Sequence, residues 1–151
     1  MPTNLVTRGI GSLLVLHENA ETPSDPEWDD CLRQLASMGP DFSKVKVLVV
    51  TEGGGPTPAQ RSRLSAVTGG KTLRSAVVTE SVRVRFIVSS VALFMPAIAS
   101  FGVEEIGRAY GHLRLDVQQR VMLERVLKEM SDGLTRPPPT IPPPRLRPPR
   151  K

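Results

Sequence analysis

The chain has 151 residues, enough for one domain with short extensions, and its 39% apolar content includes only 4% aromatic residues, so its core must be built from Val, Leu, Ile and Ala. The single cysteine, Cys31, excludes an intrachain disulfide. The net charge is +5, and five basic residues lie from Arg136 to Lys151. The rest of the chain has 20 − 5 = 15 basic and 15 acidic residues, which argues against specific nucleic-acid binding.

A soluble, cytoplasmic protein is predicted. The N-terminus lacks the apolar segment of a secretory signal. Phe86–Val103 carries no charge, but serines interrupt it and Pro96 divides it into a helix and a strand, so no transmembrane segment is expected.

The first third of the chain predicts a hairpin followed by a helix. Asn4–Arg8 and Ser12–Leu16 are typical of two strands joined by a turn at Gly9–Gly11. His17–Ser24 is predicted to be a loop. A helix is then expected with Asp25 as its N-cap and Pro26 at its first position. Its apolar stripe is formed by Trp28, Cys31, Leu32, Leu35 and Met38, and it ends at Gly39-Pro40.

The most informative stretch is the apolar run Val45–Val50, which indicates a central strand buried on both faces. Three glycines, Gly53–Gly55, follow it. Thr57 is a predicted N-cap and Pro58 the first residue of a helix that ends before Gly69-Gly70.

The remaining elements continue the alternation of strand and helix. The sequence predicts strands at Leu73–Thr79 and Ala97–Phe101 and helices at Ser81–Phe94, from Val103 to about Gly111, and from Asp116 to Met130. This order indicates an α/β fold with a four- to five-stranded, mixed but mostly parallel sheet covered by helices, and an extra C-terminal helix at 116–131.

Two parts are therefore expected: an α/β domain over residues 1–133 and a Pro/Arg-rich tail over 134–151. Eight prolines after position 136 forbid helices and central strands, which predicts a disordered tail biased toward polyproline II. Such a tail suits a proline-recognition module or an acidic surface.

The motifs give no catalytic or metal constellation. His17, His112 and Cys31 are too few and too scattered for a metal site, and no cofactor is expected. VTGGKT at 67–72 lacks the first glycine of a phosphate-binding loop and follows a helix, so it indicates a helix C-cap. The glycines at 53–55 have two interpretations, a tight turn or a backbone that presents N–H groups to a partner or an anion.

Three stretches together resemble the STAS family, the fold of anti-sigma factor antagonists related to a sporulation regulator and of bacterial STAS/SEC14-like single-domain proteins. They are VKVLVVTEGGGPTPAQR, SAVVTESVRVRFIVSSVALF and AIASFGVEEIGRAY, and the resemblance covers about Asn4 to Gly111. Family antagonists carry a phosphorylatable Ser after an Asp at the start of the helix that follows the third strand. Here Glu52 and three glycines stand in that region, and Thr57 is the nearest hydroxyl.

The resemblance implies a non-enzymatic regulatory protein–protein interaction domain whose partner binds the glycine loop. The alternative is a small-ligand or nucleotide-binding module that uses the same loop. In either case the expected binding residues are Glu52, Gly53, Gly54, Gly55, Thr57, Thr79, Ser81 and Arg83. Regulation by phosphorylation of Thr57 is not expected, because Glu52 opposes a phosphate there and Pro58 removes a donor.

Overall fold

The computed structural model describes residues 2–93 and 95–136, and within them the chain forms an α/β fold with a five-stranded mixed sheet and five α-helices. The strands are β1 (Leu5–Ile10), β2 (Leu13–Glu18), β3 (Lys46–Thr51), β4 (Arg74–Val78) and β5 (Ile98–Phe101). The helices are α1 (Asp25–Ala36), α2 (Pro58–Thr68), α3 (Val82–Ala92), α4 (Ile106–His112) and α5 (Val117–Gly133), with a 3-10 turn, η1 (Val103–Glu105), before α4. The predicted α/β class, strand number and extra C-terminal helix are confirmed.

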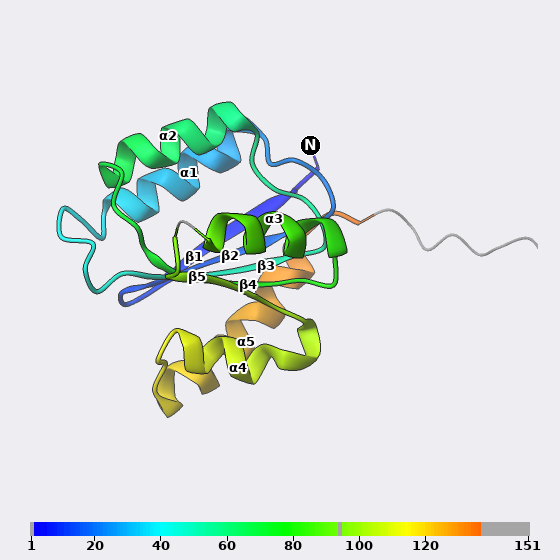
Figure 1. Ribbon diagram of the computed structural model, residues 1–151. Coiled ribbons are helices and arrows are strands. Elements are labelled where there is room, and N and C mark those ends of the chain that lie inside the picture. Colours follow the sequence, from blue (N-terminus) through cyan, green and yellow to red (C-terminus); the bar gives the residue numbers. More distant parts are fainter. Residues whose placement is uncertain (1, 94, 137–151) are drawn as a thin grey trace, which may run out of the picture.

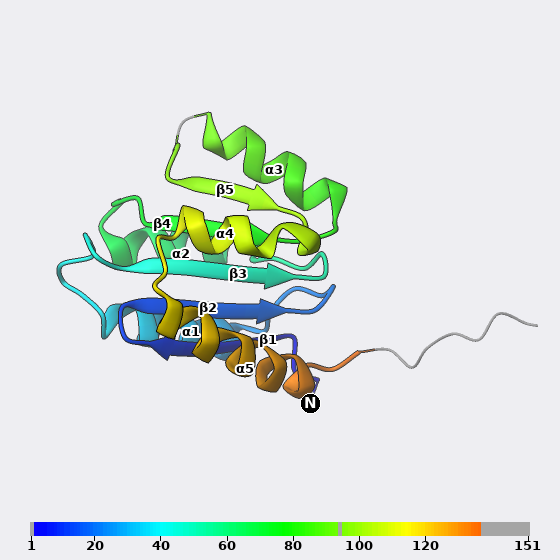
Figure 2. The same cartoon turned by 90° about the horizontal axis from the view of Figure 1, so that it is seen from below.

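The strands lie in the order of the sequence, β1-β2-β3-β4-β5; β1 is antiparallel to β2, and the other pairs are parallel. Each crossover from β2 to β5 moves one strand in the same direction. Because such crossovers are right-handed, their helices lie on one side of the sheet. Figures 1 and 2 show this arrangement, with α1 to α3 on one side, α3 beside the edge strand β5, and α4 and α5 on the other side.

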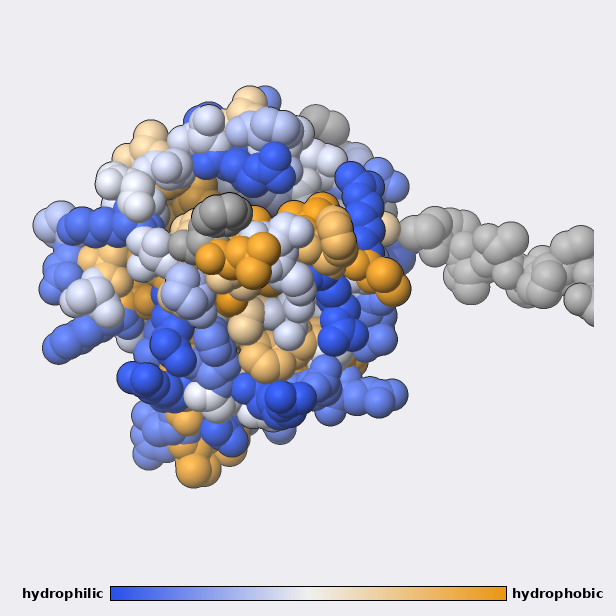
Figure 3. Space-filling model, viewed as in Figure 1, coloured by the Kyte–Doolittle hydropathy of each residue, from blue (hydrophilic) through white to orange (hydrophobic). Residues whose placement is uncertain are grey.

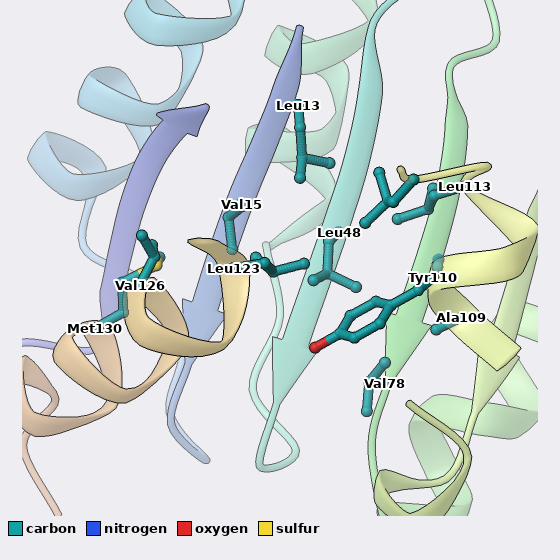
Figure 4. Close-up of a cluster of buried hydrophobic side chains, with 12 residues drawn as sticks. Leu13, Val15, Leu48, Val78, Ala109, Tyr110, Leu113, Leu123, Val126 and Met130 are labelled. Atoms are coloured by element: carbon teal, nitrogen blue, oxygen red, sulfur yellow. The ribbon is translucent and has the colours of Figure 1, made fainter. Parts of the chain in front are cut away.

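Two apolar clusters hold the layers together. The first lies between the sheet and α4 and α5, and Figure 4 shows its side chains converging from both: Leu13, Val15, Leu48, Val78, Ala109, Tyr110, Leu113, Leu123, Val126 and Met130. The second lies under α1, where Leu14 and Leu16 of β2 meet Trp28, Cys31 and Leu35. Trp28 is therefore core, as its place in the apolar stripe predicts.

The central strand is less deeply buried than predicted. Leu48 is fully buried in the first cluster, whereas Val47 and Val49 are half-buried and pack at the margin of the second. The reason lies in α2, which packs mainly on α1 rather than on the sheet. The face of β3 beneath α2 thus keeps some exposure.

Several predicted boundaries were wrong in ways that physical chemistry explains. The hairpin turn is only Gly11-Ser12, with Ile10 opposite Leu13, and Gly11 supplies the left-handed φ of 60°. β2 continues through His17 and Glu18, which were predicted to be loop, because it pairs with a neighbour on each side. Ser24, not Asp25, caps α1 in a capping box.

The folded body also extends past the predicted start of the tail at 134. Leu134 is buried, and Thr135 makes two hydrogen bonds with the backbone of Thr3. The Thr135 N–H donates to the Thr3 carbonyl at 2.8 Å, and the Thr135 hydroxyl accepts from the Thr3 N–H at 2.8 Å. Asn19 donates to the Thr135 carbonyl at 2.8 Å. The prediction of disorder for 137–151 falls outside the described residues.

We therefore expect a chain that ends at Leu134 to be about 1–2 kcal/mol less stable than one that ends at Arg136, because it loses these hydrogen bonds and the Arg136 ion pair described below. Urea unfolding of the two truncated chains, followed by Trp28 fluorescence, measures the difference. Equal midpoints would show that residues 135–136 do not contribute to folding.

Candidate functional site

The glycine turn after β3 is closed by its own hydrogen bonds. The Thr51 hydroxyl accepts from the Gly53 N–H at 3.0 Å and donates to the Gly54 carbonyl at 2.7 Å, and the Gly54 N–H donates to the Asn19 carbonyl at 2.9 Å. Gly53 has a φ of 136°, which disfavours any other residue. The Gly53 and Gly54 N–H groups, which an anion or a partner would need, therefore already donate to acceptors within the chain.

Gly54 is buried against the backbone of the loop that follows β2. A Cβ placed there would lie 2.1 Å from the Glu21 carbonyl oxygen and 2.6 Å from that of Asn19, both backbone atoms. Only glycine fits this approach, whereas a Cβ at Gly55 meets nothing within 4 Å. Gly54 therefore shapes the turn and offers no surface to a partner.

Thr79 is likewise buried and structural. Its side-chain hydroxyl donates to the Thr51 carbonyl at 2.8 Å and accepts from the Ser81 N–H at 3.1 Å, so it ties the ends of β3 and β4 together. Ser81 is the N-cap of α3 and accepts from the Val84 N–H at 3.3 Å. Of the eight predicted binding residues, Gly54 and Thr79 do not reach the surface.

Thr57 caps α2, as predicted. Its hydroxyl accepts from the Gln60 N–H at 3.1 Å, and the Gln60 side-chain carbonyl accepts from the Thr57 N–H at 3.0 Å. Gln60 is buried and donates to the Pro23 carbonyl at 3.0 Å, while Trp28 donates to the Gln60 carbonyl at 2.8 Å. The cap therefore also fixes α2 against α1.

We expect Thr57→Ala to lower the free energy of unfolding by about 1 kcal/mol and Thr57→Ser to leave it nearly unchanged, because only the alanine removes the capping oxygen. Thermal or urea unfolding of the three proteins compares them directly. An alanine variant as stable as the wild type would mean that water replaces the cap without cost.

Glu52 and Arg83 are the exposed members of the predicted site. The Arg136 guanidinium donates to the Glu52 carboxylate at 2.6 Å and also to the Ser131 carbonyl and hydroxyl, at 2.9 and 2.8 Å. Arg83 forms no ion pair within the described residues. Gly53, Gly55, Thr57 and Ser81 are half-buried, so the predicted site is a shallow rim at the carboxyl ends of β3 and β4.

Two buried ionisable side chains lie at the end of β2 and point to opposite faces of the sheet. Burial raises the pKa of Glu18 to about 8, and no hydrogen bond to its carboxyl is found within the described residues. Burial, followed by the charge of Arg136, lowers the pKa of His17 from its ordinary value, and its Nδ1 has no partner within residues 2–93 and 95–136. The two are adjacent in sequence, but the sheet separates them, so they form no acid–base pair.

The described part of the chain offers little for a ligand or a metal. It contains no group of three or more His, Cys, Asp or Glu side chains placed to hold a metal ion. Two surface hollows lie away from the glycine turn, one between α1 and α2 beside Leu32 and Val67, the other near Gly11 and Lys44. No helix in the described ranges has both the length and the apolar character needed to cross a membrane.

The outer face of α3 is exposed and apolar, and the sequence pattern alone did not predict this surface. Val82, Phe86 and Leu93 are 81%, 72% and 82% exposed, and Figure 3 shows apolar side chains gathered over α3. The opposite side of the helix, at Val84 and Val88, faces the body. A helix that is apolar on both sides is normally buried on both sides. The sequence could have indicated an unusual surface here, because α3 carries no charge after Arg85.

No protein-family model, curated protein or solved structure matches the chain.

Proposed function

We propose that this chain is a non-enzymatic regulatory interaction domain of the STAS type, similar to anti-sigma factor antagonists, which acts in the cytoplasm by binding a protein. The observation that carries the proposal is the outer face of α3, an apolar surface rimmed by Arg83, Arg85 and the carboxyl-end loops. Exposed apolar patches with a polar rim are typical of protein interaction sites.

The position of this face supports a combined site. α3 begins directly after β4, so Ser81, Val82 and Arg83 stand at the same edge of the sheet as the glycine turn. The carboxyl edge of a parallel sheet is where ligands and partners of open α/β folds bind. A partner seated on α3 would therefore reach Glu52 and Gly55 along the rim.

The hydrogen bonding of the turn favours this function over a small-ligand or nucleotide module. The Gly53 and Gly54 N–H groups donate to Thr51 and Asn19, and the three-glycine turn is not a free anion cradle. Gly54 packs directly on the preceding loop, so the turn encloses no space for a nucleotide beneath it.

The test compares proteins retained from cell extract by the immobilised full-length wild type, by Phe86→Asp and by Val121→Asp. Val121 is 64% exposed on α5, so it gives a matched apolar-to-acid change on the opposite side of the sheet. We expect a protein retained by the wild type and Val121→Asp and lost with Phe86→Asp. A melting shift of several degrees with ATP, GTP or phosphate, and no such retained protein, would favour the ligand-binding alternative.

A further inference from the structure

Four exposed residues of α3 and its C-cap form a stripe along the helix. Val82, Phe86, Ser89 and Leu93 follow one another at intervals of four, three and four residues. This spacing places the four side chains on one face of the helix. Ile87 and Val91 are less exposed, at 42% and 36%, and lie outside this stripe. Alternating intervals of three and four residues are also typical of the positions through which one helix packs against another. The occupant suited to the stripe is therefore a second helix.

The stripe is also symmetric about its centre. Intervals of four, three and four read the same in both directions, so an antiparallel copy of α3 places Phe86 opposite Ser89 and Val82 opposite Leu93. The large Phe86 ring then faces Ser89, the smallest side chain of the stripe, on both sides of the two-fold axis. Self-complementarity of this kind is what an isologous dimer contact requires.

The charges favour the antiparallel arrangement. Arg83 flanks the stripe near its N-terminal end, Arg85 on the other flank is paired with Glu105 at 3.7 Å, and the C-terminal half of α3 carries no charge. An antiparallel pair places the two Arg83 residues about 14 Å apart along the helix axis, farther than the screening length of about 8–10 Å at physiological salt. A parallel pair would bring them side by side.

The exposed apolar area approaches that of the smallest specific interfaces. At the observed exposures, Val82, Phe86 and Leu93 offer on the order of 400 Å² of apolar surface per copy, within the range of functional surface patches. Two copies therefore supply about 800 Å² from these side chains, and the stems of Arg83 and Arg85 extend the contact toward the roughly 1,200 Å² at the lower end of specific interfaces.

We propose that α3 binds α3 of a second copy of this chain, antiparallel and around a two-fold axis, through the stripe of Val82, Phe86, Ser89 and Leu93. This inference rests on the proposed function, because it names the partner of the same face. The first test is the mass of the purified full chain in solution between about 5 and 500 μM, by sedimentation velocity. We expect two-copy mass for the wild type and for Val121→Asp, and a dissociation constant raised at least 100-fold by Phe86→Asp.

The second test fixes the orientation. Val82→Cys and Leu93→Cys chains, distinguished by a size tag, are mixed and oxidised; Cys31 is buried and does not compete. A disulfide-linked dimer in the mixture, with little in either variant alone, supports the antiparallel contact. Efficient linkage of Val82→Cys to itself would overturn it.

The outcomes separate this inference from the proposed function. A wild type that stays monomeric up to 500 μM, or a Phe86→Asp dimer as tight as the wild type, overturns the inference. If the purified chain is monomeric but the extract contains a partner lost with Phe86→Asp, the inference fails and the proposed function holds. A monomer with no Phe86-dependent partner overturns both.

Discussion

Replacing Glu18 by Gln is expected to raise the free energy of unfolding at pH 7 by about 2–3 kcal/mol. The Glu18 carboxyl is buried beside apolar side chains under α1, and burial raises its pKa to about 8. The folded state therefore keeps the proton at pH 7, whereas the unfolded chain releases it near its ordinary pKa of about 4.5. Gln is similar in shape and carries no such proton-linked cost.

The sign of the pH dependence follows from the raised pKa. Below about pH 4.5 both states bind the proton, and Glu18 has no linked effect. As pH rises from about 4.5 to about 8, only the unfolded state loses the proton, so the contribution of Glu18 becomes steadily less favourable and then levels off. The advantage of Glu18→Gln should thus be small at pH 4 and largest above pH 8.

His17 affects stability in the opposite direction. Its pKa is lowered by burial, so its contribution to stability is lost as pH falls below its ordinary value of about 6.5. The difference between wild type and Glu18→Gln cancels this effect, since both proteins contain His17. Urea unfolding at pH 4, 7 and 9 measures that difference, with the exposed Glu104→Gln as the control. A difference that does not grow with pH would contradict the prediction.

Replacing Gly54 by Ala is expected to lower the free energy of unfolding by about 3 kcal/mol. The added Cβ would lie 2.1 and 2.6 Å from two backbone oxygens, and neither can move as the tip of a side chain can. Relief of the overlap must separate the turn from the 19–21 loop and stretch the Gly54 hydrogen bond to Asn19.

The neighbouring glycines provide a matched series. Gly55→Ala should change stability by less than about 0.5 kcal/mol, because its Cβ meets nothing within 4 Å and its φ is not in the left-handed region. Gly53→Ala should cost an intermediate amount, about 1–2 kcal/mol, from its φ of 136°. Chemical denaturation measures the loss of stability in the three variants, which should be largest at Gly54 and smallest at Gly55. Any other order would mean that the turn rearranges.

The same series bears on how the site works. Because Gly54 is buried, we expect Gly54→Ala to reduce partner binding only in proportion to the loss of folded protein. Loss of affinity per folded molecule with Gly55→Ala, whose position is partly exposed, would instead place the turn in the interface. This comparison separates a structural turn from a recognition surface.

The sequence by itself determined the elements and their order. The alternation of β-branched runs with capped helices is local information, so it predicted the mostly parallel sheet, the Thr57 cap and the glycine C-cap at Gly69, which has a φ of 63°. Helix caps and left-handed turns depend on residues that are close in sequence, so they can be predicted without knowledge of the fold.

Only the tertiary structure decided which of these residues reach the surface. Gly54 and Thr79 were expected to bind a partner, but both are buried by contacts with Asn19, Glu21 and Thr51, distant segments that local pattern does not place beside them. Glu18 was predicted to lie in a loop, but it belongs to β2, which pairs with a strand on each side. α3 carries apolar residues on both sides, and its place beside the edge strand left one face uncovered. Burial is a property of long-range packing, and periodicity alone reports only which side chains share a face.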